Sequence, residues 1–391
     1  MTQKIKAKGK FNASLLFLAT TFFWFGQYAY VPYVNPTLSH LGTSAVFMGW
    51  VSGAYGMTQL ILRVPLGLWT DRIGKKRSVT IGCLLCAVSS FCMLSISHPA
   101  AFLIGRGLAG AASSSWVAFT ILYSTYFPAE QSSASIAMIN VSSQIGQLTA
   151  FAAGGAAVSL FGVKASFITA GIAGVIAFIL TFFISDQSAA KAPVSLRDFI
   201  IVIRNRNLLI CSLYSAAAQL IAFSTFQTFV NNHAAAVGLN MEQLSYMYLF
   251  VLAPCIIAGY IIGKHLFRLI NVKILIAAGF LLLAAYCFII PAAVNAAQIF
   301  LTSILAGVGY GFTFNVLLGL CVKDIPMEKR SAAMGFFQAV YGIGMTLGPV
   351  VMGWITDSFS LNAGFMTIAA VSLLTAASVP AAFTRGASYT D

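Results

Sequence analysis

Residues 67–77 read Gly-Leu-Trp-Thr-Asp-Arg-Ile-Gly-Lys-Lys-Arg, and they interrupt a chain that is otherwise strongly apolar. An apolar run lies on each side of this charged segment, at 44–70 and at 78–97. A helix needs about 20 apolar residues to cross a hydrocarbon core that is ~30 Å thick. The segment therefore predicts two membrane-spanning helices joined by a short basic turn.

The same alternation of apolar runs and polar connections continues along the whole chain. Of the 391 residues, 59% are hydrophobic and 8% are charged, whereas soluble domains carry about 25% charged residues. This composition excludes a soluble globular protein. Because the hydrocarbon core holds no water that could bond to backbone N–H and C=O groups, each apolar run is expected to be helical. The predicted fold is an all-α membrane protein with twelve transmembrane helices, at 12–37, 44–70, 78–97, 100–126, 132–157, 161–184, 208–232, 243–263, 273–292, 296–321, 331–356 and 362–384.

The basic residues indicate how the chain is oriented in the membrane. Counting Arg63 at its helix end, the side of the membrane that holds the two termini has 20 of the 22 Lys and Arg residues, whereas the opposite loops hold only Lys164 and Arg106 lies inside a span. Cytoplasmic loops carry such an excess, so both termini are expected in the cytoplasm, with a bacterial inner membrane as the location. The net charge of +13 is thus spread over loops, and no nucleic-acid partner is expected.

The chain also carries an internal repeat. Phe-Pro-Ala-Glu at 127–130 returns as Ile-Pro-Met-Glu at 325–328, which is an offset of 198, and Gly42 corresponds to Gly238 at an offset of 196. Parallel repeats of this kind place a binding site at their interface near the middle of the membrane. We expect two pseudo-symmetric six-helix bundles, at 1–184 and 208–391, joined by a cytoplasmic central loop at 185–207.

The segment 67–77 closely resembles the G-x-x-x-D-R-x-G-R/K-R/K signature of the major facilitator superfamily, and the twelve spans follow the plan of that family. Arg106 with Gly110 resembles its intramembrane arginine motif, and the glycines and proline of 344–353 resemble its glycine-proline motif. The resemblance implies a secondary transporter whose halves rock about a central cavity. It also implies a conformational switch made of Gly67, Asp71, Arg72, Gly74, Lys75, Gly344, Gly348 and Pro349.

Two observations limit what this resemblance implies. Phe151 stands where the drug-antiporter branch has proline in its fifth helix, which disfavours that branch. A plain basic loop with a turn also accounts for most of 67–77. Topology alone does not require an acid at position 71, however, whereas an aspartate there can stabilise the N-terminus of a facing helix, for instance near Ser331.

Two arginines are placed inside the predicted spans. Arg106 lies about eight residues from the outer end of its helix, or roughly 12 Å deep, and Arg63 lies eight residues before Asp71. Charged groups at such depth cost about 2.5–3.5 kcal/mol on insertion scales and are functional candidates. Arg63 shares a helix stripe with Ser52, Tyr55 and Gln59. The alternatives are snorkelling of Arg63 to the headgroups and a structural role for Arg106.

The acids and histidines are distributed differently from these arginines. All nine Asp and Glu residues and all four His residues fall in loops, tails or helix ends. The sequence therefore places no proton relay in mid-membrane, and guanidinium groups bind carboxylate or phosphate well. We expect a small anion as substrate, moved by uniport or by exchange of one anion for another, with any proton travelling on the substrate.

Polar and aromatic residues of several spans are further candidates for the substrate site. For each of them, helix–helix packing or an interfacial anchoring role is the alternative. With the arginines and the stripe of Arg63, the predicted substrate-binding residues are Arg106, Arg63, Gln59, Tyr55, Gln27, Tyr30, Ser113, Trp116, Asn140, Gln144, Gln219, Phe226, Tyr310, Gln338 and Tyr341. Tyr310 and Asn315 point in different directions on a regular helix, so only one of them is expected to face the cavity.

Other functions fit the sequence less well. The 13% of aromatic residues and the 12 Met leave open an efflux pump for amphipathic drugs or lipids, and a transport-inactive membrane sensor is a further alternative. No catalytic trio, metal-ligand cluster or P-loop pattern is present in the sequence, so we expect neither an enzyme nor a cofactor. The expected partners are the small-molecule substrate and the lipid bilayer, and the expected state is a monomer.

Overall fold

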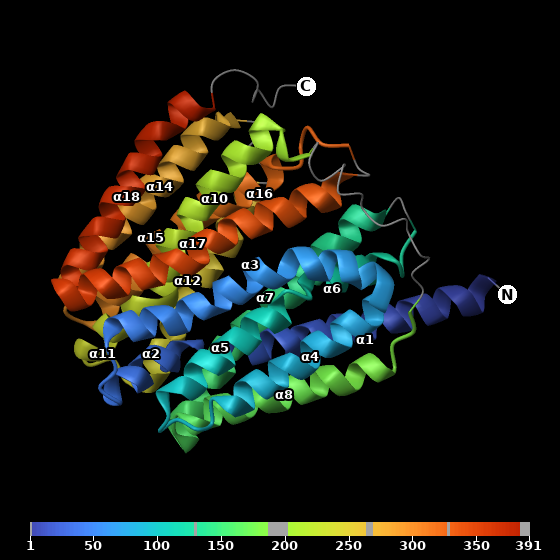
Figure 1. Ribbon diagram of the computed structural model, residues 1–391, viewed down its shortest axis with the longest axis horizontal. Coiled ribbons are helices and arrows are strands. Elements are labelled where there is room, and N and C mark those ends of the chain that lie inside the picture. Colours follow the sequence, from blue (N-terminus) through green and yellow to red (C-terminus); the bar gives the residue numbers. More distant parts are fainter. Residues whose placement is uncertain (1, 129–130, 187–201, 263–268, 327–328, 384–391) are drawn as a thin grey trace. The chain divides into compact units, whose positions relative to one another are not determined.

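The structure is a computed structural model that describes residues 2–128, 131–186, 202–262, 269–326 and 329–383, and within these ranges every regular element is a helix (Figure 1). The first half contains α1 (Thr2–Tyr28), α2 (Val31–His40), α3 (Ala45–Ile73), α4 (Lys75–Cys92), α5 (Pro99–Ser113), α6 (Trp116–Ser124), α7 (Ser132–Phe161) and α8 (Lys164–Phe182). The second half contains α10 (Arg206–Ser224), η2 (Thr225–Phe229), α11 (Val230–Ala236), α12 (Met241–Ile261), α14 (Val272–Ile289), η4 (Ile290–Ala292), α15 (Ala296–Tyr310), η5 (Gly311–Asn315), α16 (Val316–Leu320), α17 (Arg330–Ser358) and α18 (Leu361–Ala382).

These helices follow the twelve predicted spans in order, although several spans are built from more than one helix. The first span breaks after Tyr28, because Pro32 has no backbone N–H to continue the ladder. The fourth span breaks between α5 and α6, where the hydroxyls of Ser114 and Ser115 bond to Gly110 and Ala112 carbonyls of the preceding turn. Such back-bonding bends helices. Eight continuous helical segments of the described residues, three of them made of more than one of these helices, are long and apolar enough to cross a membrane.

The largest difference from the predicted boundaries is at the start of the chain. The first helix begins at Thr2, ten residues before the predicted start at position 12. The prediction followed the hydrophobic run, which starts only after the segment in which lysines alternate with other residues. Lys and Ala are nevertheless good helix formers. The helix therefore continues beyond the part that would lie in lipid.

The contacts divide the chain into two compact units. Unit 1 comprises Met1–Val31 and Ile61–Pro193, and unit 2 comprises Pro32–Leu60 and Val194–Asp391. The division cuts through α3, so the first part of this helix groups with the second half of the chain. The expected boundaries at 184 and 208 remain a proposal, and residues 187–201 of the central loop lie outside the described residues.

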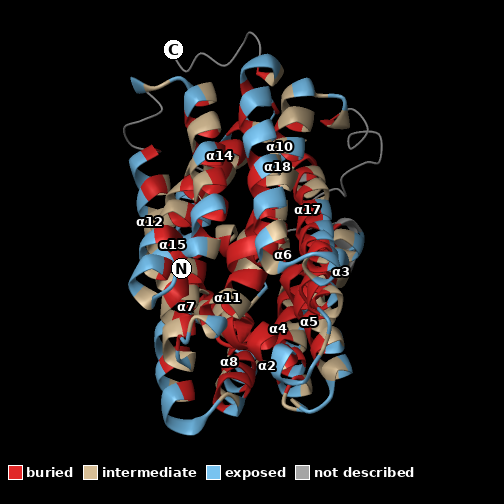
Figure 2. Cartoon of the chain, turned by 90° about the vertical axis from the view of Figure 1, so that its left-hand side faces the viewer, coloured by how far each residue is buried: buried red, intermediate tan, exposed pale blue. Residues whose placement is uncertain are grey.

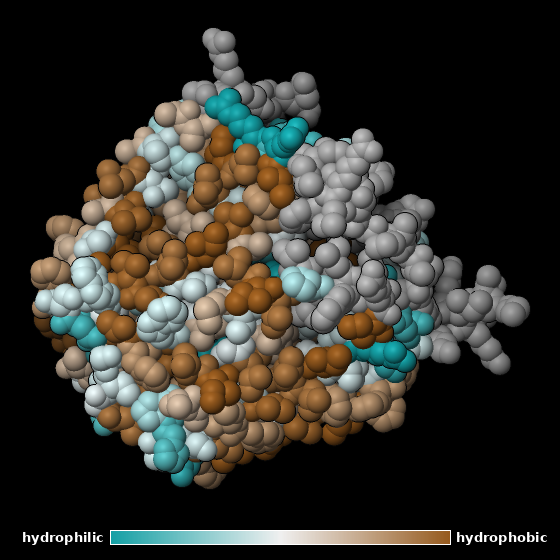
Figure 3. All heavy atoms as spheres, viewed as in Figure 1, coloured by the Kyte–Doolittle hydropathy of each residue, from teal (hydrophilic) through white to brown (hydrophobic). Residues whose placement is uncertain are grey.

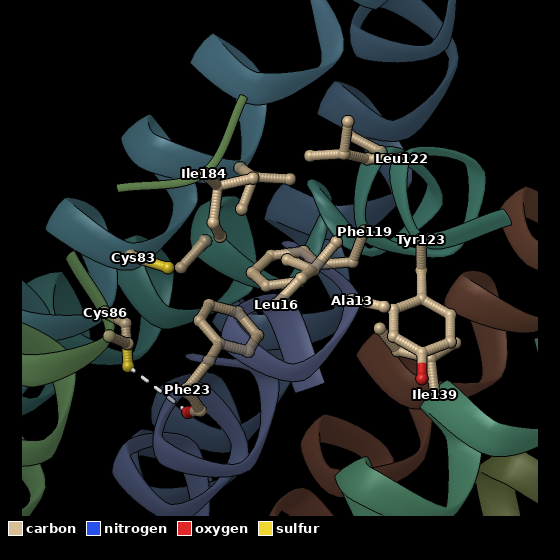
Figure 4. Packing of buried hydrophobic residues seen from close by; sticks show 14 residues of the cluster. Ala13, Leu16, Phe23, Cys83, Cys86, Phe119, Leu122, Tyr123, Ile139 and Ile184 are labelled. Carbon is tan, nitrogen blue, oxygen red and sulfur yellow. Dashed lines mark hydrogen bonds between the residues drawn. The ribbon is translucent and has the colours of Figure 1, made fainter. Parts of the chain in front are cut away.

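The core of unit 1 is built by helices from both ends of the first half. Phe23 of α1 lies among Leu16, Phe119 and Cys86, and the Cys86 thiol lies 3.6 Å from the Phe23 carbonyl oxygen, to which it donates (Figure 4). Small residues allow this closeness, since a Cβ on Gly26 would lie 2.9 Å from the Cys86 sulfur. The free cysteines of this core thus act as small packing residues.

Unit 2 is held by close helix pairs and capped helix ends. A Cβ on Gly344 of α17 would lie 2.0 Å from the carbonyl oxygen of Ala216 in α10, and one on Gly348 would lie 2.6 Å from that of Leu220. At the start of α12, Asn240 and Gln243 form a capping box, in which each side chain accepts from the backbone of the other residue. Glycines thus set the spacing between helices, and polar caps set where the helices begin.

The outward faces of the helices are apolar. Figure 2 shows that most helices carry a buried and an exposed face, and Figure 3 shows hydrophobic side chains over much of the visible face. Leu160, Phe161 and Leu374 are each more than 70% exposed. A soluble protein rarely exposes so large an apolar surface, so this surface is the one that contacts lipid.

Candidate functional site

Both intramembrane arginines are buried inside the protein. Arg63 of α3 and Arg106 of α5 expose 6% and 7% of their surface. The residues that share the stripe of Arg63 are buried as well, at 6% for Ser52, 6% for Tyr55 and 3% for Gln59. The stripe therefore faces protein, and Arg63 does not lie on the outer surface as a simple snorkelling arginine would.

The carboxylates whose side chains the structure describes lie at helix ends or in the connections that follow them, and they have partners there. Asp186 accepts from the backbone N–H of Lys76 at 3.3 Å, Asp324 from the side chain of Asn207 at 3.1 Å, and Glu242 from the hydroxyl of Tyr246. Asp357 accepts from the first two N–H groups of α3. The side chain of Asp71, and Glu130, Asp198, Glu328 and Asp391, lie outside the described part.

In unit 1 a row of aromatic rings links α6, α1 and α7. Trp24 lies edge-on to Trp116, with centroids 5.2 Å apart, and 5.8 Å from Tyr28, which in turn lies 5.8 Å from Phe151. Phe119 continues the row beyond Trp116. We refer to these five rings as the first aromatic run.

Polar atoms without a hydrogen-bond partner lie in the same helix turns as this run. The Gln27 amide donates to the carbonyl oxygen of Ala109 at 3.2 Å, one turn from Arg106, but Gln27 Oε1 and Trp24 Nε1 have no hydrogen-bond partner. Leaving such a group buried and unsatisfied costs about 1–3 kcal/mol. The arrangement therefore has capacity for an additional polar partner close to α5.

Unit 2 contains a comparable row that links η2, α15, η5 and α17. Phe226 lies 5.7 Å from Tyr310, Tyr310 stacks on Phe314 at 5.2 Å, and Phe314 lies 5.5 Å from Tyr341. Phe337 completes the row against Phe314 and Tyr341. We refer to these five rings as the second aromatic run.

Two glutamines share helix stripes with the second aromatic run. Gln219 lies two turns before Phe226 on α10, and Gln338 lies one turn before Tyr341 on α17. They expose 5% and 8% of their surface, and the Oε1 atom of each has no hydrogen-bond partner. On the same face of α10, Phe223 stacks on Tyr55 of α3 with centroids 6.1 Å apart.

Two rings of each aromatic run occupy equivalent positions in the internal repeat. Tyr28 and Phe226 differ by 198 in residue number, as do Trp116 and Phe314. The same offset relates Asn140 to Gln338. The repeat that the sequence indicated thus extends to the side chains of the candidate site, and Gly42 and Gly238, with φ of 71° and 96°, end equivalent helices.

Two local features of this site do not follow from the sequence pattern. The segments η2 and η5 are π-helical turns inserted in otherwise α-helical spans, and such turns often mark functional sites. Phe226 of η2 contacts Tyr310, the last residue of α15 before η5. The glycines at 307, 309 and 311 were the one available signal, because they weaken the regular helix before η5.

Several predicted residues lie away from the aromatic runs. Tyr30 stacks on Phe167 with centroids 5.8 Å apart and is fully buried, and Ser113 is buried at the end of α5. Asn140 is exposed and donates to Ile136 one turn earlier in its own helix, while Gln144 is half-buried. Asn315 lies against Cys255 of α12, whereas Tyr310 belongs to the second aromatic run, so the two residues point in different directions.

The predicted switch residues are only partly described. The side chains of Asp71 and Arg72, and the surroundings of Gly67, lie outside the described part of α3. Gly74 has a φ of 95°, which is the conformation expected of a glycine in a tight turn, and Lys75 is buried. Gly344 and Gly348 allow the close contact of α17 with α10, and Pro349 lies within α17.

Comparison with known proteins assigns the family. The sequence matches the family model described as Major Facilitator Superfamily over residues 16–331 and 325–389. The chain belongs to the major facilitator superfamily. It is therefore a multi-pass membrane transporter for small molecules, and not an enzyme, as the sequence predicted.

Relatives and solved structures agree with this assignment. The chain is 21% identical to an uncharacterized MFS-type transporter of Methanocaldococcus jannaschii, over 81% of this chain and 84% of that protein. It is 23% identical to the inner membrane transport protein YajR of Escherichia coli, over 86% and 76%. A variant of the nucleoside transporter NupG has a TM-score of 0.77 at 16% identity, covering 97% of this chain and 100% of that one. A bacterial homolog of the human lysosomal transporter Spinster has a TM-score of 0.76 at 13% identity, covering 95% and 96%. The predicted fold of twelve helices in two related bundles is confirmed.

Proposed function

We propose that this MFS transporter moves a small organic anion with a flat, unsaturated part across the cytoplasmic membrane, by uniport or by anion exchange. The observation that carries the proposal is the burial of Arg63 and Arg106 within the protein, at 6% and 7% exposure. Buried positive charge favours a cargo with carboxylate or phosphate oxygens.

The flat part of the cargo is inferred from the two aromatic runs. Aromatic faces bind planar rings by offset stacking or edge-to-face contact. The unsatisfied oxygens of Gln27, Gln219 and Gln338 supply acceptors for N–H or O–H groups of a substrate. The structural similarity to NupG, whose name describes nucleoside transport, supports a cargo with a planar heterocycle.

Efflux of amphipathic drugs or lipids is the second candidate, and the aromatic runs favour it. Such a cargo would use the rings without the arginines. A segment of 84 residues that is 32% identical to multidrug resistance protein 1 of Bacillus subtilis supports this alternative, although it covers only 21% of the chain.

The two candidates are separated by binding of matched ligands to the purified protein. Aromatic carboxylates and their carboxamides have the same shape and differ in charge. We expect the carboxylate to raise the melting temperature and the carboxamide to have little effect. Arg106→Gln and Arg63→Gln should abolish the shift, and Lys164→Gln, which changes an exposed lysine at the start of α8, should preserve it. Equal binding of both ligands, retained in Arg106→Gln, would support the amphipathic cargo instead.

Flux into liposomes tests the mode of transport. For an anion without a titratable proton, uptake should depend on an anion inside the vesicle, or on the anion gradient alone. Stimulation of that uptake by a pH gradient would refute uniport and anion exchange.

A further inference from the structure

A group of polar residues meets within unit 2, where α2, η2, α11 and α12 come into contact. Asn35 of α2 donates from its side-chain amide to the Thr228 carbonyl oxygen at 3.2 Å. Asn231 of α11 donates to the Tyr248 hydroxyl at 2.8 Å, and that hydroxyl donates to the Gln227 carbonyl oxygen at 3.3 Å. All five residues belong to unit 2, and we refer to them as the oxygen cluster.

The directions of these bonds determine which atom of each amide is the oxygen. A backbone carbonyl can only accept, so Asn35 must direct its NH₂ group at Thr228. The Tyr248 hydroxyl gives its hydrogen to the Gln227 carbonyl, so it accepts from the NH₂ group of Asn231. The Oδ1 atoms of both asparagines are therefore left for another partner.

Three oxygen atoms of the cluster have no hydrogen-bond partner among the described residues. They are Asn35 Oδ1, Thr228 Oγ1 and Asn231 Oδ1, and their residues are 2%, 1% and 1% exposed. Residues three positions apart lie on the same face of a helix, so Thr228 and Asn231 point to one side, where Asn35 bonds to Thr228. Buried polar groups without a partner are costly. Three of them together indicate a ligand that attracts oxygen.

The backbone of η2 adds acceptors at the same place. This segment is a π-helical turn, and side chains of α12 and α2 reach the carbonyl oxygens of Gln227 and Thr228. Interrupted membrane helices coordinate Na⁺ through backbone carbonyls of this kind. Hard cations such as this one prefer oxygen ligands, which is the only kind of ligand that the cluster offers.

The charges on the surrounding segments favour a monovalent cation. Residues 31–60 and 225–251 contain no Lys or Arg, and their one acid is Glu242, which accepts from the Tyr246 hydroxyl. Divalent cations are usually held by carboxylates, whereas the oxygens of the cluster are neutral. A single water molecule has only two hydrogens to donate, so it would leave one of the three oxygens unsatisfied. A cation attracts all three.

We propose that the oxygen cluster binds a Na⁺ ion, which holds α2, α11 and α12 together. Asn35 Oδ1, Thr228 Oγ1 and Asn231 Oδ1 are its side-chain ligands, and Tyr248 positions Asn231. No residue of the cluster belongs to the predicted substrate-binding residues or to either aromatic run. The inference therefore does not rest on the identity of the cargo, and it is tested with salt alone.

Thermal unfolding of the purified full-length protein tests the site, with NaCl compared with choline chloride at equal ionic strength. We expect Na⁺ to raise the melting temperature saturably, by about 1–3 °C at about ten times the half-saturating concentration. Thr228→Val keeps the shape of the side chain and removes one ligand, so it should raise the half-saturating Na⁺ concentration by roughly five- to tenfold. It should also raise the melting temperature in choline chloride, because a buried oxygen without a partner is removed.

Two further variants make the outcome specific. Thr225→Val is the matched control, because Thr225 lies in the same turn and is fully buried, but its hydroxyl donates to the Ile221 carbonyl oxygen at 2.7 Å. Its dependence on Na⁺ should equal that of the wild type. Asn231→Asp adds a negative charge beside the ion and should lower the half-saturating Na⁺ concentration by roughly tenfold.

Three results would overturn the proposal. The first is a wild-type melting temperature that is the same in NaCl and in choline chloride. The second is a Na⁺ dependence that Thr228→Val leaves unchanged, since the ion would then bind elsewhere. The third is a half-saturating concentration that Asn231→Asp leaves unchanged or raises.

Discussion

Tyr310 and Phe314 stack with their ring planes 6° apart and their centroids 5.2 Å apart, on either side of the point where α15 becomes π-helical. Residues four positions apart lie on the same face of a helix, one above the other. Phe314 then contacts Phe337 and Tyr341 of α17. Phe314 of η5 therefore joins Tyr310 to the rings of α17 in the second aromatic run.

Phe314→Leu should weaken substrate binding more than it weakens the fold. Leucine retains much of the volume, which limits the loss of stability to about 1.5 kcal/mol, but it removes the face on which a flat substrate stacks. We expect the KM for transport to increase severalfold. Thermal unfolding should show a loss of stability of no more than about 1.5 kcal/mol. Phe250→Leu is the matched control, since Phe250 and Phe300 also stack at 6° and 4.8 Å outside either aromatic run. An equal effect of both variants on KM would contradict a role of Phe314 in binding.

Gln219→Leu should raise stability while it lowers transport. The Gln219 oxygen is buried and has no hydrogen-bond partner, so its removal recovers about 1–3 kcal/mol of desolvation cost. If the oxygen accepts from the substrate, transport falls at the same time. Gln298→Leu should have the opposite effect on stability, because Gln298 Oε1 accepts from Val294 N–H at 2.8 Å. Unfolding temperature and liposome flux measure the two quantities separately.

Gly344→Ala should separate α10 from α17. The added methyl group would lie 2.0 Å from the Ala216 carbonyl oxygen. The neighbouring atoms belong to the backbone of α10, which cannot move aside as the end of a flexible side chain could. Overpacking costs about 1–3 kcal/mol or more. Gly335→Ala is the control on the same helix, because it meets no atom within 4 Å and should stabilise the helix by about 0.5–1 kcal/mol. A similar melting temperature for the two variants would show that the close contact is not maintained.

The sequence was sufficient for the order of the spans, because hydrophobic length is imposed by the bilayer and is local in the chain. It also predicted the turn at Gly74 and the burial of the stripe that contains Arg63, since both follow from a residue and its near neighbours. The breaks near Tyr30 and Ser114 and the π-helical segments were missed. They depend on competing hydrogen bonds and on contacts with other helices.

The site was predictable to a similar extent. Aromatic and amide residues were identified as candidates, but the rows they form arise from contacts between residues far apart in the chain, as between Trp24 and Trp116. Asp357 was assigned only to a helix end. Its bonds to Ala45 and Val46 link positions that no periodicity connects.

Gly74→Ala should destabilise the turn between α3 and α4. Gly74 has a φ of 95° and a ψ of 141°, a region that residues with a Cβ rarely adopt, at a cost of about 1–3 kcal/mol. The space around the site is not the obstacle, because a Cβ would lie 3.6 Å from the nearest atom, Asp186 Oδ2. Gly319→Ala, at a helical position with no atom within 4 Å, separates the backbone effect from loss of glycine as such. Thermal unfolding should show a clear decrease in the melting temperature for Gly74→Ala and no decrease for Gly319→Ala. Equal melting temperatures would mean that the turn adopts another conformation without cost, and Gly74 would then not be required by the backbone.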